Sequence, residues 1–180
     1  MFLLLVSIVE GVENYQAMLR IYNTLFGNLS TFIEITFYLY VFREIVYAPR
    51  AKRVFLYLVS IYPLIALLNI FFIQRNGFHT MTYALGCLLI IASCIYYFLQ
   101  LFQRPSFVNL SRQPAFWICS GLLFYYTCTF PLYGAVNMLK LFPRVILSNL
   151  LYLLVLLNIL LYLSFTIAFL CRLKTRRSMS

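Results

Sequence analysis

The sequence predicts an all-α protein, a polytopic transmembrane helix bundle with five full spans and a short or truncated N-terminal sixth. Four stretches of more than 20 residues contain no Lys, Arg, Asp or Glu. They are Val54–Gln74, Asn76–Gln103, Gln113–Leu139 and Val145–Cys171. A fifth stretch, Ile21–Phe42, is interrupted only by Glu34. Because an apolar helix crosses the hydrocarbon core with roughly 20 residues, each stretch is long enough for one span.

The composition favours a single membrane domain over residues 1–180. Hydrophobic residues make up 64% of the chain, and the connectors are too short for a soluble domain. Backbone groups in lipid must be hydrogen-bonded within their own segment, so the spans are expected to be helices. The net charge of +10 would favour nucleic acid in a soluble protein. Here the cations stand at span ends, which indicates contact with the lipid bilayer and no nucleic acid.

Prolines and turn residues divide the uncharged stretches into helices. Pro49 ends the first helix because proline cannot continue the hydrogen-bond ladder. The composition of Gln74–Gly77 is typical of a turn, and the connector 103–114 contains Pro105 and Pro114. The five predicted helices cover residues 20–47, 52–73, 80–101, 115–138 and 143–173.

The first 18 residues allow three interpretations. Residues 1–9 are apolar but too short to span the bilayer alone. The segment 1–18 can be the end of a span whose start lies before this chain, an interfacial amphipathic helix, or a signal peptide. A signal peptide would carry a basic first region, which is missing here. We therefore favour a short or truncated first span.

The cations divide unequally between alternate connectors. One side has ten, and the other has four. The ten are Arg43, Arg50, Lys52, Arg53, Arg104, Arg112, Arg172, Lys174, Arg176 and Arg177. Arg20, Arg75, Lys140 and Arg144 form the smaller group. Because cationic connectors stay in the cytoplasm, we expect a multi-pass protein of the cell inner (cytoplasmic) membrane with a cytoplasmic C-terminus.

Glu34 is the strongest candidate for a functional residue. An ionised acid in the middle of a span costs a few kcal/mol, so such residues face the bundle interior or a wet cavity. Asn23, Gly27, Ser30, Glu34 and Tyr38 follow one helical stripe, which predicts an inward face. Glu34 is then either a proton, cation or ligand site, or a protonated acid kept for packing. We rank the packing role slightly ahead.

A second polar stripe, Asn158, Tyr162 and Thr166, lies in the last helix and offers partners for Glu34. Bonds of this kind typically contribute under about 1–2 kcal/mol each, so structural cohesion is the favoured role. The candidate intramembrane site therefore comprises Glu34, Ser30, Tyr38, Asn158 and Tyr162.

No pattern for catalysis, metal binding or a cofactor is present. The sequence contains no metalloprotease, nucleophile-elbow or phosphate-loop motif. The five cysteines form no CxxC pair and are expected to pack as small apolar residues. His79 is expected in a turn at the outer face, where a lone histidine is usually incidental. The sequence thus predicts a protein that is not an enzyme and has no cofactor and no metal.

Several short motifs resemble a family of uncharacterised bacterial polytopic membrane proteins. They are Tyr22–Asn23, Phe32–Glu34, Asn109 with Pro114–Ile118, Gly121–Tyr125 and Ile167–Cys171. Some members resemble the membrane input segment of sensor histidine kinases. The resemblance covers residues from about 20 to 172, and because this sequence ends nine residues after Cys171, no kinase domain is expected in it. It implies a sensory or regulatory membrane protein.

Two functions are therefore expected. The first is a non-enzymatic sensory, regulatory or partner-binding module, with a membrane protein partner or a homo-oligomer. The second is a small transporter or channel subunit that uses Glu34. A membrane enzyme ranks third, because lipid-modifying enzymes usually show acid, histidine or metal clusters at one interface.

Overall fold

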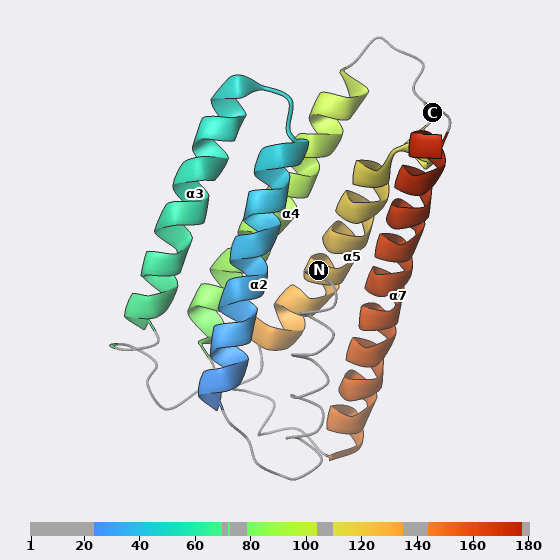
Figure 1. The fold of residues 1–180 in the computed structure, drawn as a ribbon. Coiled ribbons are helices and arrows are strands. Elements are labelled where there is room, and N and C mark those ends of the chain that lie inside the picture. The colour runs from blue at the N-terminus through green and yellow to red at the C-terminus, as the bar shows by residue number, and fades with distance from the viewer. Residues whose placement is uncertain (1–23, 70–71, 73–78, 104–109, 135–143, 178–180) are drawn as a thin grey trace.

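The computed structural model describes residues 24–69, 72, 79–103, 110–134 and 144–177. Within these ranges the chain forms five α-helices and one short 3₁₀ helix, without any β-strand (Figure 1). The elements are α2 (Thr24–Ile45), α3 (Pro49–Leu68), α4 (Thr80–Phe102), η2 (Leu110–Arg112), α5 (Pro114–Gly134) and α7 (Arg144–Arg177). The all-α class predicted from the sequence is confirmed for this part of the chain.

The helices lie side by side in one bundle. α2, α4 and α7 run in one direction, and α3 and α5 run in the other (Figure 1). α2 packs against α3 and α4, α4 packs against α5, and α5 packs against α7. Short connections explain the consecutive antiparallel pairs α2–α3, α4–α5 and α5–α7, whereas α2 and α4 are packed parallel to each other.

Among the residues that the structure describes, four helices are long and apolar enough to cross a membrane, so the chain is an integral membrane protein. These candidate spans are Pro49–Leu68, Thr80–Phe102, Pro114–Leu132 and Tyr152–Leu173. α2 has 22 residues, enough to cross, but Asn28 and Glu34 lower its hydropathy. The structure thus supports four spans and not the expected five plus one. The segment 1–18 lies outside the described residues.

Helix α3 begins at Pro49 and not at residue 52. Proline suits the first helical position, because the N–H that it lacks has no partner there in any helix. The same residue therefore ends the preceding extended segment and starts the next helix. α2 has already ended at Ile45.

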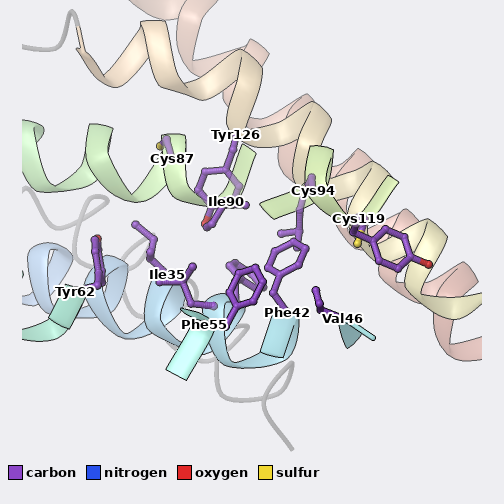
Figure 2. Packing of buried hydrophobic residues seen from close by; sticks show 14 of the residues in the cluster. Ile35, Phe42, Val46, Phe55, Tyr62, Cys87, Ile90, Cys94, Cys119 and Tyr126 are labelled. Carbon is purple, nitrogen blue, oxygen red and sulfur yellow. The ribbon is translucent and has the colours of Figure 1, made fainter. Parts of the chain in front are cut away.

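The bundle core lies between α2 and its neighbours. Asn28, Ile35, Leu39 and Phe42 of α2, and Val46 directly after it, are each at most 1% exposed, and the spacing of the four α2 residues places them on one helix face. Figure 2 shows three of them, Ile35, Phe42 and Val46, among the other buried side chains.

The other helices contact this face of α2 through rings and small side chains. The Phe42 ring stacks on Phe55 of α3 with centroids 6.0 Å apart and an interplanar angle of 18°. On α4, Cys87, Ile90 and Cys94 are fully buried (Figure 2). The core is therefore apolar and aromatic, with small thiols filling the interhelical space.

Large apolar side chains also point outward. Examples are Val54 and Leu64 on α3, Leu88 on α4, and Val155 and Leu163 on α7, all at least half exposed. In a soluble protein such surfaces would promote aggregation, whereas here they are suited to lipid tails.

The charged residues gather at one end of the bundle. Arg43 closes α2, while Arg50, Lys52 and Arg53 open α3 at the same end. Arg112 precedes α5 and Arg172 stands near the end of α7, also at this end (Figure 1). The described residues at the opposite end include one cation, Arg144. We call the first the cationic end and the second the polar end.

Candidate functional site

The candidate site is built around Glu34 in the middle of α2. Its side chain is half-buried, and Tyr38 follows it by one helical turn. The Tyr38 hydroxyl donates a hydrogen bond to the Glu34 carboxylate. Tyr38 itself is 3% exposed, so the bond is made inside the bundle. One carboxylate oxygen of Glu34 is therefore hydrogen-bonded by a side chain from the next turn of its own helix, as intramembrane acids usually are.

Tyr38 also joins three helices. Its ring lies edge-on to Tyr126 of α5, with centroids 6.1 Å apart and an interplanar angle of 79°. The ring of Phe165 on α7 lies 6.2 Å from it on a tilted plane. Edge-to-face aromatic pairs of this kind contribute about 0.5–1.5 kcal/mol beyond the burial of their surface. The hydroxyl that binds Glu34 therefore belongs to the side chain that links α2 to α5 and α7.

The carboxyl group of Glu34 also acts on groups from other helices. Its charge reaches the phenol of Tyr126 on α5 and the thiol of Cys87 on α4. Both side chains are almost fully buried (Figure 2). We call Glu34, Tyr38, Cys87 and Tyr126 the central site. A change in the charge of Glu34 would act strongly on Cys87 of α4 and Tyr126 of α5, because both side chains are buried, where the effective dielectric constant is low.

A second set of buried polar groups occupies the polar end. The backbone N–H of His79 donates to Oδ1 of Asn28, 3.3 Å away. The side-chain amide N–H of Asn69 donates a hydrogen bond to Oγ1 of Thr82. The Tyr62 hydroxyl donates to the Thr82 carbonyl at 3.3 Å. These five residues, each at most 4% exposed, form what we call the His79 cluster. They tie the ends of α2, α3 and α4 together.

The imidazole of His79 is fully buried, although the sequence predicted an incidental histidine in a turn at the outer face. Burial lowers the pKa of His79 from 6.5 to about 4, because the charged imidazolium loses its water. The histidine is therefore neutral at pH 7. This burial was not predictable from the sequence, since His79 stands next to a composition typical of a turn.

A third polar contact lies between the two sets. The Tyr83 hydroxyl of α4 donates to Oγ1 of Thr129 on α5 at 3.4 Å, and Thr129 donates to the Tyr125 carbonyl at 2.9 Å. Tyr83 also hydrogen-bonds with the Cys87 thiol of the central site. Buried polar groups thus extend from the His79 cluster along α4 to the central site.

The residues predicted from the sequence are placed as follows. Ser30 is half-buried and donates its hydroxyl to the Gly27 carbonyl at 3.0 Å, within α2. Tyr162 of α7 is half-buried and acts electrostatically on Tyr38, so it lies beside the central site. Asn158 is half-buried, one turn before Tyr162 on α7.

The inward face of α2 differs from the predicted stripe. Gly27, Ser30 and Glu34 are half-buried, whereas the fully buried face passes through Asn28 and Ile35, one position later in each turn. The reason is that large apolar side chains fill the core, and the polar stripe is displaced to its border. Tyr38 is on both faces. Asn23 lies outside the described residues.

The cysteines fill interhelical space. Cys94 of α4 and Cys119 of α5 are fully buried, and their thiols hydrogen-bond across the helix interface (Figure 2). Within the ranges that the structure describes, no three His, Cys, Asp or Glu side chains come together as metal ligands would.

Comparison of the chain with family models, with curated proteins and with solved structures gives no match. The resemblance to bacterial sensor proteins therefore stays a prediction. The chain's own residues and their geometry therefore carry the function proposed below.

Proposed function

We propose that this integral membrane protein is a non-enzymatic regulatory module, in which the helix packing around Glu34 responds to a signal and passes it to a membrane partner. The observation that carries the proposal is the bond between Glu34 and Tyr38, because the Tyr38 ring packs on both α5 and α7. An intramembrane acid is retained at a cost in stability and usually has a function.

The mechanism requires two packings of similar free energy. A carboxylate at Glu34 accepts the hydrogen bond of Tyr38 and holds the ring against Tyr126. A protonated or partner-bound Glu34 changes that bond, so the contact of α2 with α5 and α7 shifts. Such a switch needs only a few kcal/mol of differential interaction, which one buried hydrogen bond and one ring contact can supply.

The exposed face of α2 supports a partner in the membrane. Leu29, Ile33 and Tyr40 are 46%, 52% and 46% exposed, and Ile33 directly precedes half-buried Glu34. A helix from a membrane protein partner, or from a second copy, would cover these side chains and complete the burial of the acid. Polar side chains at such interfaces favour helix association in lipid.

In this proposal α2 is a fifth span, the cationic end faces the cytoplasm, and the membrane is a bacterial inner membrane. The support for the orientation is the concentration of cations at one end of the bundle. The short motifs that resemble bacterial sensor proteins agree with it.

The proposal is tested by photo-crosslinking in cells. A photoreactive residue replaces Ile33 on the exposed face of α2, and a control replaces Leu64, which is 61% exposed on α3. We expect a specific crosslinked partner at position 33 and none at 64, and weaker crosslinking when Glu34→Leu is added. A protein that crosslinks to nothing but lipid at both positions would refute a partner at α2.

A small transporter or channel subunit is the second candidate. The row of buried polar groups from His79 through Thr82 and Tyr83 to the central site favours it, since polar side chains inside a membrane mark ion and proton paths. Purified protein in liposomes would then conduct protons or cations, and Glu34→Gln would abolish the flux. Flux that persists in this variant would exclude Glu34 from the path.

A further inference from the structure

The first turn of α3 concentrates positive charge at the cationic end. Arg50, Lys52 and Arg53 are all exposed there, and the turn contains no acidic residue. We call these three residues the α3 cationic patch. Glu44, the nearest described acid along the chain, forms an ion pair with Arg43 at 3.7 Å. The charge of Glu44 is thus already partly matched.

This arrangement is unfavourable in the isolated chain. Cations three residues apart on a helix repel each other by a few tenths of a kcal/mol. They also oppose the positive end of the helix dipole, which usually attracts acids to the first turn. The buried and exposed apolar residues of α3 hold the helix in place nonetheless. The patch is therefore a surface that an external anion would stabilise.

The position of the patch along α3 shows how deep in the membrane a bound anion would lie. Val54 and Tyr57 follow the patch directly and are 55% and 64% exposed. An exposed tyrosine one turn after Arg53 is typical of the membrane interface, and exposed Leu64, further along α3, is suited to lipid tails. The patch thus lies about one helical turn, roughly 5 Å, outside the hydrocarbon layer. This is the depth of the phospholipid headgroups.

We propose that the α3 cationic patch binds the headgroup phosphates of anionic phospholipids. The two guanidinium groups match phosphate oxygens with paired N–H donors, and the Lys52 ammonium adds a third charge. The exposed apolar side chains of α3 between the patch and Leu68 contact the acyl chains of the same lipid. Free inorganic phosphate would bind the cations in the same way but would make no contact with the apolar face of α3.

The proposal is tested by thermal unfolding of the full chain in mild detergent. Phosphatidylglycerol, phosphatidylcholine and inorganic phosphate are titrated separately. We expect phosphatidylglycerol alone to raise Tm, and high salt to reduce the rise. In Arg50→Gln/Lys52→Gln/Arg53→Gln, the lipid concentration that gives half the rise should increase by about 100-fold, since each basic residue contributes several-fold.

The matched control is Lys174→Gln/Arg176→Gln/Arg177→Gln, which removes the same charge from the last turn of α7. It should keep the wild-type response to phosphatidylglycerol. An unchanged response in the α3 variant, or equal losses in both variants, would overturn the assignment. So would an equal rise with inorganic phosphate. If the triple variant does not fold, Arg50→Gln/Arg53→Gln answers the same question, with a loss of about 30-fold expected.

Discussion

Glu34 and Tyr38 show how one residue pair can connect chemistry to packing. The acid makes its hydrogen bond one turn along its own helix, and the tyrosine that donates it is the aromatic contact with α5 and α7. A local bond in α2 is thereby coupled to a long-range contact. Removing the acid should loosen the bundle, although Glu34 itself touches little of the apolar core.

The first prediction concerns substitutions of Glu34. Glu34→Gln retains the size and an acceptor for the Tyr38 hydroxyl, so its unfolding free energy in detergent should be nearly that of the wild type. Glu34→Leu removes the acceptor and should lower the unfolding free energy by about 1–2 kcal/mol. Chemical denaturation followed by circular dichroism measures both. Equal stability of the leucine variant, with position 34 open to a lipid-soluble label in Glu34→Cys, would exclude the packing role.

The second prediction concerns pH and His79, which directly precedes α4. The unfolded chain protonates this histidine near pH 6.5, whereas burial keeps the folded form neutral until about pH 4. The unfolded state therefore binds more protons between these values, and stability falls as pH falls from 6.5 towards 4. At pH 5 we expect a loss of about 1–2 kcal/mol relative to pH 7. Thermal unfolding at several pH values measures it.

His79→Gln is the control for that experiment, because it removes the titrating group at similar size. Its stability between pH 6.5 and 5 should be nearly flat, whatever its stability at pH 7. A slope equal to that of the wild type would show that other groups, such as the glutamates, cause the loss.

Sequence reasoning predicted only part of the candidate site. It identified Glu34 and Tyr38, because an acid in an apolar stretch is conspicuous and residues four apart share a face. It did not identify Asn28, Thr82 or Thr129, since these short polar side chains are common on any helix. Their role depends on which helix lies opposite, and that is a tertiary property.

At the scale of elements, Gly86 allows α2, α3 and α4 to come together. A Cβ at this position would lie 2.5 Å from Cδ1 of Ile35 and 2.8 Å from the Tyr62 hydroxyl oxygen. The small residue thus makes room for the tyrosine that bonds to the Thr82 carbonyl. Close approach at small residues is a common way to pack helices in lipid. α5 and α7 use the same device, with Gly121 facing Ser164.

The third prediction follows from this crowding. Gly86→Ala should destabilise the bundle by about 1–3 kcal/mol, because Ile35 and Tyr62 must move and both are fully buried. Gly27→Ala is the matched control, since no atom lies within 4 Å of its added Cβ. The control should be neutral or up to about 1 kcal/mol more stable, as alanine favours the helix. Thermal unfolding of both variants in one detergent compares them, and equal effects would contradict the packing argument.

The helices themselves were largely predictable, because long uncharged stretches have few alternatives in lipid. The helix starting at Thr80 agrees with the prediction at its first residue. The predicted start of α3 at residue 52 is wrong because proline both stops one helix and favours the first position of the next, here Pro49. The number of spans was less predictable. α2 is long enough to span the bilayer, but it contains polar residues that face other helices.

At the scale of the whole molecule, the two ends of the bundle differ in kind. The polar end has neutral buried side chains in the His79 cluster, whereas the cationic end has exposed arginines and lysines. The central site lies between them. A signal or substrate that reaches Glu34 from the polar end would therefore act on helices anchored by charge at the other end.

The last prediction is the direction of the bundle in the membrane. Transferring the cationic end across the membrane is unfavourable, and this end has most of the chain's cations, so it should remain in the cytoplasm. A reporter active only in the cytoplasm should therefore be active when fused after Ser180. The same reporter fused after Gly77, between α3 and α4 in the sequence, should be inactive because α3 ends and α4 begins at the opposite end. The reverse pattern would place the polar end in the cytoplasm and the α3 cationic patch on the outer leaflet. Activity at both positions would mean that α4, α5 and α7 do not all span the bilayer, because an odd number of crossings separates the two fusion sites.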